Sequence, residues 1–349
     1  MGERRQDPVT GEWVIVAPER AARPHEHTRH GGRPVLPAHD PACPFCPGNE
    51  AALPPILEET AAEGGAEPWA TRVIANLYPA VRPDGAPAGP FPADGRALPA
   101  RGRQEVIIES PRHDADLATM CDEQAAAVIG TWARRYRLMA EDPAVAGAVV
   151  FRNYGRGAGA SLAHPHAQAI ALAATPPRLA RILRRGRAYY RLAGRCVLCA
   201  MLADERADGR RLVADNGHFV ALSPFASARP FEIWLVPARH QATFAEIAPA
   251  GERALAGLLR RILAGLRAVA DDPDYCCVIE SLGGAHRGAP HAHWWLRLWP
   301  DTATPGGFEL GSGLAIHAGS PEADAAGLRA AVAAAADQGP GISQLQKTP

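Results

Sequence analysis

The 349-residue sequence contains no apolar run long enough to cross a membrane, and its first residues, MGERRQDPVTGEW, contain no apolar segment of the secretory type. A spanning helix needs about 20 consecutive apolar residues. A signal peptide needs a shorter apolar stretch behind a basic start. We therefore expect a soluble, cytoplasmic protein that has no membrane partner.

The sequence also lacks net charge, because Lys plus Arg and Asp plus Glu each number 37. A balanced chain produces no overall field that would attract nucleic acid or an anionic membrane. We expect no nucleic-acid partner, and any phosphate-binding site must be built from local groups.

Glycine fingerprints of nucleotide-binding folds are missing as well. No G-x-G-x-x-G opens a helix after a strand-like segment, and the one glycine-rich loop that stands out lacks the G-K-[ST] of a P-loop. Strand-like segments are more numerous than a doubly wound fold requires. The sequence therefore predicts an α+β fold built on antiparallel sheet.

Cysteine is present in an odd number, seven, which does not suit a disulfide framework. Four of the cysteines form two C-x-x-C pairs, Cys43 with Cys46 and Cys196 with Cys199. In a reducing compartment such pairs bind metal or perform redox chemistry. A thioredoxin-like redox pair needs a βαβ context, which this sequence does not offer, so metal binding is favoured.

An internal repeat follows each C-x-x-C pair. The segments EVIIESPRH, ending at His113, and EIWLVPARH, ending at His240, each lead into an amphipathic helical pattern, a strand-like run, a Gly-rich loop and an H-x-H. The distance from His113 to His164 equals the distance from His240 to His291. Such a shared spacing indicates duplication. We expect two units, residues 1–180 and 181–349, each an antiparallel sheet with packed helices.

The repeated cysteines and histidines suit zinc. Two thiolates and two imidazoles complete a tetrahedral shell and leave no position for water, which is typical of structural sites. The first set is Cys43, Cys46, His113 and His164. The second set is Cys196, Cys199 and His240 with either His291 or His293, and the repeat spacing favours His291.

The segment SLAHPHAQ suggests a nucleophile. On a strand, residues two apart share a face, so His164, His166 and Gln168 point the same way. Pro165 cannot donate to a sheet, which favours an edge strand or a strand end. An imidazole with one nitrogen held presents the other as a nucleophile or base. A merely structural role for His166 is the alternative on this pattern alone.

The preceding loop, NYGRGAGAS, could hold a phosphoryl group. Gly155, Gly157 and Gly159 would let backbone N–H groups approach an anion, and Ser161 adds a hydroxyl. Beside a nucleophilic His166, this loop predicts a site for phosphoryl chemistry.

Taken together, HPHAQ after a Gly and Ser-rich loop, DPVTGEWVIVAPERAARP and CPFC resemble the galactose-1-phosphate uridylyltransferase family of the histidine-triad superfamily. The resemblance spans Asp7 to about Arg329. It implies two tandem histidine-triad-like units and a homodimer whose active sites borrow residues from the partner. It also implies a role in galactose metabolism. His166 would attack the α-phosphorus of UDP-glucose and release glucose 1-phosphate, and galactose 1-phosphate would collect the uridylyl group in a ping-pong cycle.

The same resemblance implies roles for further residues. Arg20 and Arg23 would hold phosphoryl oxygens, and Asn76 would contact the nucleotide. Asn153, Ser161 and Gln168 would surround the transferred phosphate, and Phe308 and Glu309 would meet the hexose. Hydrolases of the superfamily carry histidine at the place of Gln168. An amide cannot titrate, so glutamine favours transfer over hydrolysis.

Other segments resemble the branch that contains ADP-glucose phosphorylase, in which the histidine carries AMP and inorganic phosphate is the acceptor. These segments are CVLCAM, PFASARPFEIWLVPARH and GGFELGSG. In that branch the second metal uses the histidine before W-x-L, and PHAHWWLRL aligns without a gap, so this resemblance selects His293. A non-catalytic double zinc-binding module is the alternative of another class, but it would need neither the Gly-rich loop nor His166.

Overall fold

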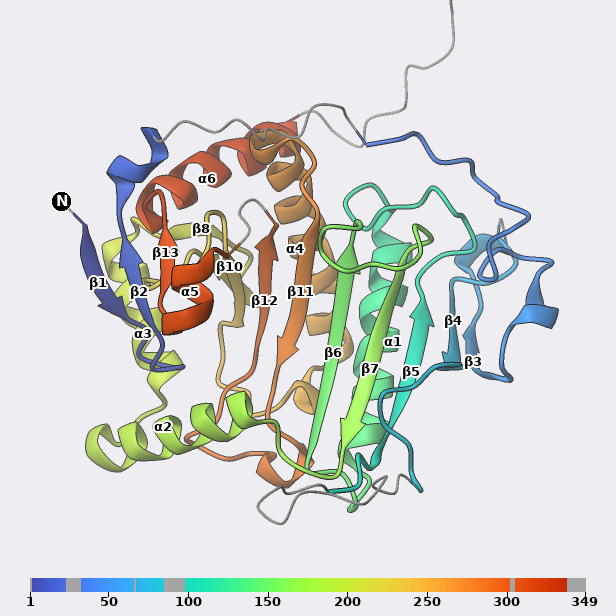
Figure 1. Cartoon of the computed structure of the whole chain (residues 1–349), viewed down its shortest axis with the longest axis horizontal. Coiled ribbons are helices and arrows are strands. Elements are labelled where there is room, and N and C mark those ends of the chain that lie inside the picture. Colours follow the sequence, from blue (N-terminus) through green and yellow to red (C-terminus); the bar gives the residue numbers. More distant parts are fainter. Residues whose placement is uncertain (1, 23–32, 66, 85–97, 302–304, 338–349) are drawn as a thin grey trace, which may run out of the picture.

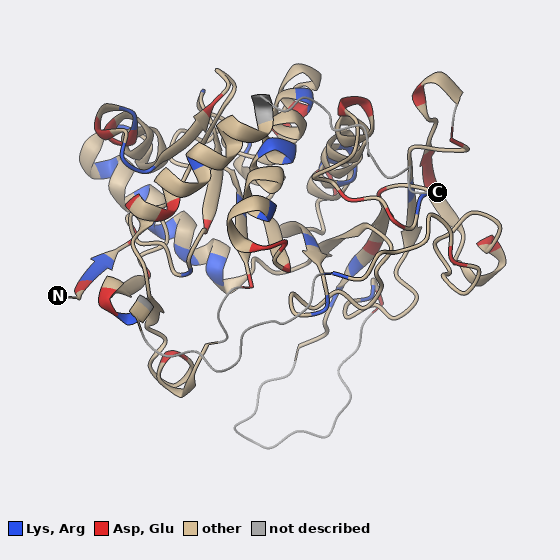
Figure 2. Cartoon of the chain, turned by 90° about the horizontal axis from the view of Figure 1, so that it is seen from above, with Lys and Arg blue, Asp and Glu red and all other residues tan. Residues whose placement is uncertain are grey.

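The computed structural model describes residues 2–22, 33–65, 67–84, 98–301 and 305–337. Arg23, most of the Pro and Gly-rich stretch around residues 85–97, and the C-terminal tail lie outside the described residues. Within the described parts no helix is both long and apolar enough to cross a membrane. Basic and acidic residues occur in both halves of the view in Figure 2, as the balanced charge predicts.

Ten strands form one continuous sheet in the order β3-β4-β5-β7-β6-β11-β12-β10-β9-β8 (Figure 1). Every neighbouring pair in it is antiparallel. The strands are β3 (Ile56–Thr60), β4 (Thr71–Ala75), β5 (Gly102–Ile108), β6 (Gly147–Tyr154), β7 (His166–Leu172), β8 (Leu212–Asp215), β9 (Phe219–Leu222), β10 (Ile233–Pro237), β11 (Tyr275–Glu280) and β12 (Trp295–Pro300). A small second sheet joins β1 (Glu3–Gln6), β2 (Trp13–Val16) and β13 (Ala315–His317).

Helices cover one face of the large sheet along its whole width. They are α1 (Asp122–Ala140), α4 (Pro249–Ala270) and α6 (Pro321–Asp337), and their apolar faces meet the strands in one core that includes Trp132, Val150 and Leu259. Two more helices, α2 (Pro177–Ala193) and α3 (Val197–Asp208), pack with the second half of the sheet, and the short α5 (Gly307–Ser312) precedes β13. The remaining turns of helix are the 3-10 segments η1 (Pro18–Ala22), η2 (Glu50–Ala52), η3 (Glu63–Gly65), η4 (Phe244–Glu246) and η5 (Gly284–His286).

The order of the strands in the large sheet repeats between the two halves of the chain. Read inward from its two edges, the sheet runs β3-β4-β5-β7-β6 on one side and β8-β9-β10-β12-β11 on the other, so both halves share one order and meet where β6 pairs with β11. The predicted α+β fold with antiparallel sheet is confirmed. The division into residues 1–180 and 181–349 falls inside α2 and stays a prediction.

The two halves differ on the sheet face that α1 and α4 do not cover. In the second half this face is buried, with Trp234 and Trp295 in an apolar cluster that α2 and α3 complete. In the first half Phe151, Asn153 and Gln168 on β6 and β7 are only half-buried. The first half therefore keeps an accessible polar face at the start of β7.

Of the two expectations for Pro165, an edge strand or a strand end, the first is wrong and the second is confirmed. Strand β7 lies inside the sheet, paired with β5 on one side and β6 on the other. Pro165 directly precedes the strand, where its missing N–H removes no bond of the ladder. Its carbonyl accepts a hydrogen bond from the backbone N–H of Glu109 (3.0 Å), which fixes the chain as it enters β7.

Candidate active site and metal centres

The first Cys–His set comes together as the sequence predicts. The ligand atoms of Cys43, Cys46, His113 and His164 all lie within 4.8 Å of one another, and all four residues are buried. The Sγ to Nδ1 distances are 3.6 Å and 3.7 Å. Zinc in a tetrahedral shell with ordinary Zn–S and Zn–N bonds separates sulfur from nitrogen by about 3.5 Å. The cluster thus has the size and donor set of a closed metal site.

Backbone contacts set the orientation of these ligands. Cys43 and Cys46 lie in consecutive turns, and the side-chain amide of Asn49 donates to the carbonyl of Cys43 (2.8 Å). The Nε2–H of His164 donates to the carbonyl of Ser110 (2.8 Å). This bond leaves Nδ1 of His164 aimed at the two sulfurs, an arrangement common for histidine ligands.

The second Cys–His set also assembles, with His293 as its fourth member. Cys196 precedes α3 and Cys199 lies in its first turn, while His240 follows β10 and His293 precedes β12. The Sγ to Nδ1 distances are 3.4, 3.6 and 3.9 Å. This cluster is closer to the surface, since His240 is exposed and Cys199 half-buried.

His291 lies outside this cluster, where its Nε2 accepts a hydrogen bond from Nε of Arg187 (3.3 Å). The repeat spacing therefore misleads at this position. The start of the following strand is the better reference, because His164 stands two residues before β7 and His293 two residues before β12.

His166 is the first residue of β7 and is 7% exposed. Its Nδ1 lies 2.9 Å from the carbonyl oxygen of His164, and a carbonyl can only accept, so Nδ1 carries the proton and Nε2 has the lone pair. The ring of Phe45 contacts His166 edge-on, with 5.6 Å between the centroids. Burial lowers the pKa of His166, which favours the neutral imidazole. One ring nitrogen of His166 is thus held by a member of the first Cys–His set, and the other, Nε2, carries the lone pair.

Gln168 points from β7 to the same face and is held by two donors. Its Oε1 accepts from Nε2 of Gln104 (2.6 Å) and, more weakly, from Nδ2 of Asn76 (3.4 Å). Because the oxygen is occupied, the amide N–H groups of Gln168 are the ones left to meet a ligand. Sequence reasoning missed Gln104, since its approach to Gln168 depends on the pairing of β5 with β7.

The remaining predicted contacts of the phosphoryl group lie nearby. Asn153 is on β6, on the face that carries Phe151, and Phe151 is the direct partner of Gln168 across the ladder. Ser161 is exposed in the loop that leads to His164. Asn153 therefore lies beside the start of β7, and Ser161 lies in the loop that precedes it.

The loop glycines serve a different purpose from the one expected. The N–H of Gly157 donates to the carboxylate of Asp274 (2.5 Å), and the N–H of Gly159 bonds inside the loop. Gly155 has a φ of +83°, and a Cβ there would lie 1.9 Å from Asp274 Oδ1. The glycines thus let the loop fold tightly around Asp274, and the expected cradle of open N–H groups at Gly157 and Gly159 is wrong.

A buried ion pair supports the site from the helix-covered side of the sheet. Arg152 and Glu109 are 1% and 0% exposed and lie 2.8 Å apart. Arg152 also donates to the hydroxyl of Tyr275 (2.5 Å). Arg152 is the ladder partner of Ala167, the residue between His166 and Gln168. The ion pair therefore lies on the opposite face of the sheet from these two side chains, at the same level of β7.

Three predicted substrate contacts lie in another part of the fold. Arg20 is exposed in η1, after β2, and Phe308 and Glu309 belong to α5. Glu309 caps its own helix by accepting from the N–H of Gly306 (3.0 Å). In Figure 1, β2 and α5 lie on the β12 side of the large sheet, with β11 and β6 between them and β7. The structure therefore does not bring these residues to His166 of the same chain.

Comparisons with known proteins identify relatives of this chain. The family model for the N-terminal domain of galactose-1-phosphate uridyl transferase matches residues 1–176. ADP-glucose phosphorylase of Arabidopsis thaliana is 33% identical over 326 residues, which covers 92% of this chain and 90% of that protein. Galactose-1-phosphate uridylyltransferase of Thermotoga maritima is 29% identical and covers 76% and 75%.

Solved structures resemble the chain over nearly its full length. The Arabidopsis thaliana ADP-glucose phosphorylase with bound ADP-glucose has a TM-score of 0.80 at 31% identity and covers 94% of this chain and 98% of its own. A uridylyltransferase structure has a TM-score of 0.74 at 27% identity and covers 96% and 99%.

Proposed function

The chain belongs to the galactose-1-phosphate uridyl transferase family and to its nucleotidyl-transferring enzymes, and we propose that it works through a covalent nucleotidyl-histidine at His166. The observation that carries the proposal is the hydrogen bond from Nδ1 of His166 to the carbonyl of His164. It fixes both the tautomer and the orientation of the ring, so Nε2 carries the lone pair that a nucleophile needs.

The reaction has two displacements at one phosphorus. In the first, Nε2 of His166 attacks the α-phosphorus of a nucleotide sugar; the N–P bond forms, the bond to the bridging oxygen breaks, and the sugar 1-phosphate leaves. In the second, a phosphate oxygen of the acceptor attacks the same phosphorus and the N–P bond to His166 breaks. His166 returns to its starting state, which is the ping-pong pattern of covalent catalysis.

Gln168 would donate its amide N–H to a non-bridging oxygen of the transferred phosphoryl group. Donors aimed at developing negative charge stabilise such a transition state. Gln104 and Asn76 keep the amide in this orientation by occupying its oxygen. Gln168 offers no proton to a leaving group, which favours an intermediate that waits for a phosphorylated acceptor.

We propose ADP-glucose as the donor and inorganic phosphate as the acceptor, giving ADP and glucose 1-phosphate. Support comes from the similarity to ADP-glucose phosphorylase, which extends over nine-tenths of both chains. The second Cys–His set, which resembles that branch in sequence, supports the same choice.

UDP-glucose with galactose 1-phosphate is the second candidate pair. The family model and the similarity to the Thermotoga maritima enzyme favour it. The two candidates differ in base and in acceptor, so initial rates with all four combinations of ADP-glucose or UDP-glucose and phosphate or galactose 1-phosphate separate them. Turnover of ADP-glucose that depends on phosphate supports the first pair. Turnover of UDP-glucose that depends on galactose 1-phosphate selects the second.

We further propose that both Cys–His sets hold zinc. Each set offers two thiolates and two imidazoles at distances that suit a tetrahedral ion. A closed shell of this kind supplies structural rigidity rather than a reacting water. At the first set, the residue that would gain rigidity is His164, whose carbonyl positions the His166 ring.

A homodimer completes the proposal, because Arg20, Phe308 and Glu309 lie apart from His166 in the same chain. Coexpression of two inactive chains, His166→Asn and Arg20→Ala, tests it. If the partner supplies Arg20, the mixed dimer contains one site with both native residues and regains activity. If Arg20 acts within its own chain, every site in the mixture lacks one residue and the mixture stays inactive.

A further inference from the structure

Helix α2 contains six arginines and no acidic residue, and its arginines divide into two groups. Those in the first group have partners in the N-terminal segment. Arg178 and Arg181 form ion pairs with Glu12, and Arg185 donates to the backbone carbonyl of Pro8. These three side chains attach the N-terminus to the rest of the fold.

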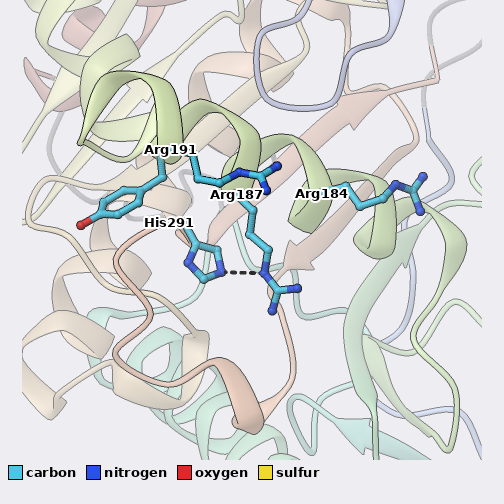
Figure 3. Close-up of a pocket in the computed structure, with 5 residues that line it drawn as sticks. Arg184, Arg187, Arg191 and His291 are labelled. Atoms are coloured by element: carbon cyan, nitrogen blue, oxygen red, sulfur yellow. Dashed lines mark hydrogen bonds between the residues drawn. The ribbon is translucent and has the colours of Figure 1, made fainter.

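The second group, Arg184, Arg187 and Arg191, is exposed and follows one side of the helix at intervals of three and four residues (Figure 3). None of them forms an ion pair with an acidic residue in the described part of the chain. With Tyr190 and His291 they line an open depression with a volume of about 340 Å³, called here the α2 pocket. Sites for small molecules occupy roughly 300 to 1,000 Å³.

The α2 pocket is held in shape by close packing of the helix on the loop that carries His291. Gly186 allows this approach, since a Cβ there would lie 2.6 Å from the carbonyl oxygen of His291. Arg187 donates from Nε to the His291 ring (3.3 Å), which leaves the two terminal nitrogens of its guanidinium directed away from that bond (Figure 3). The ring of Tyr190 lies 6.4 Å from that of His291.

The charge of the pocket is local. The neighbouring loop, residues 283–292, carries Arg287 and no acidic residue, and its Gly288 N–H donates to the carboxylate of Glu246 (2.8 Å). Since the whole chain has balanced charge, this concentration of unpaired guanidinium groups is not a general property of the surface. Planar guanidinium groups bind phosphoryl oxygens through paired hydrogen bonds, and several of them together favour a multiply charged anion.

We propose that the α2 pocket binds a phosphorylated metabolite that carries at least two negative charges. The pocket is separate from His166 of the same chain, because His166 begins β7 and α2 begins only after the other end of that strand. A strand of this length spans about 20 Å. A ligand in the pocket would contact His291, which lies in the loop that leads to His293 of the second Cys–His set.

Calorimetric titration with inorganic pyrophosphate tests the proposal. The proteins are the unchanged enzyme, the double variant Arg187→Ala/Arg191→Ala, and Arg210→Ala as a control that removes an exposed arginine from a different surface. The expected result is a binding step that the double variant loses or weakens roughly tenfold or more, and that the control retains. All of the replaced side chains are exposed, so thermal unfolding should be unchanged in each variant.

A variant with lysine at positions 184, 187 and 191 separates charge from geometry, and it should bind more weakly than the native protein but more tightly than the alanine variant. The proposal is overturned if the double variant binds pyrophosphate as the native protein does, or if Arg210→Ala weakens binding equally. It is also overturned if the native protein binds no pyrophosphate. A change of sedimentation in the alanine variant would then show that the pocket is a contact with another chain.

Discussion

Gln104 offers a direct test of how the site orients its phosphoryl donor. Replacing Gln104 with Glu keeps an acceptor for the backbone N–H of Ala80, which lies 2.8 Å from Gln104 Oε1, but removes the donor that lies 2.6 Å from Gln168 Oε1. Gln168 then keeps only the longer bond from Asn76 (3.4 Å), and the new carboxylate attracts its amide N–H groups. The amide turns its oxygen toward the phosphoryl group.

The expected loss follows from the value of one hydrogen bond. A net contribution of about 0.5 to 1.5 kcal/mol corresponds to a decrease in kcat of roughly 2-fold to 13-fold. Since the contact acts on the transferred phosphoryl group, kcat should fall more than KM rises. Steady-state kinetics of the native enzyme, Gln104→Glu, Gln168→Leu and the double variant give the coupling between the two residues.

In the double variant, Gln104→Glu should add little to the effect of Gln168→Leu. The reasoning is refuted if Gln104→Glu has native kcat, or if it lowers kcat equally whether or not Gln168 is present.

Three further predictions concern the metal sites, the buried ion pair and the effect of pH. Cys46→Ser removes a thiolate that approaches both His113 and His164, so zinc content measured by mass spectrometry should fall by one ion per chain and Tm should drop, while replacement of the exposed Cys121 changes neither. Arg152→Met leaves Glu109 buried and unpaired and should cost about 3 to 5 kcal/mol in urea unfolding, part of which the added change Glu109→Gln restores; equal stabilities would contradict this. Burial raises the pKa of Asp7 from 3.8 to about 6. Between these pH values Asp7 is protonated in the folded state and ionised in the unfolded state, so the free energy of unfolding decreases as the pH rises through this range. Asp7→Asn should therefore raise Tm relative to the native protein at about pH 7.5 but not at about pH 4, and a gain that is independent of pH would be evidence against this cause.

Much of the fold and both Cys–His sets could be predicted because their signals are chemical and repeated. Cysteine and histidine at the same places in two segments have few alternative uses, and the matching order of strands, helices and loops required only hydrophobic pattern. Helix α6 illustrates how local such signals are: Pro321 opens it, and the hydroxyl of Ser320 accepts from the N–H of Ala323 (3.1 Å), as expected for a cap.

Predictions that depended on how the strands are arranged in the folded chain were less successful. The repeat spacing favours His291, and only the resemblance selects His293, because the choice depends on where β12 starts. The interior position of β7 likewise depends on the order of strands in the sheet. Counting residues between motifs reveals neither, because loops absorb insertions without moving the strands.

The supporting residues were missed for the same reason. Gln104 meets Gln168 only through the pairing of β5 with β7, and Phe45 meets His166 only because its loop folds over the start of β7. The Gly-rich loop shows the opposite error, since its glycines were assigned to a ligand while their close neighbour is Asp274.

The most direct test of the central claim is the mass of the intact protein after incubation with ADP-glucose in the absence of phosphate, followed by digestion to locate any adduct. A covalent adenylyl group on the peptide that contains His166, absent from His166→Asn and released as ADP when phosphate is added, is the predicted result. An unmodified protein that nevertheless turns over ADP-glucose when phosphate is present, or an adduct that persists in His166→Asn, would contradict the assignment of His166 as the nucleophile.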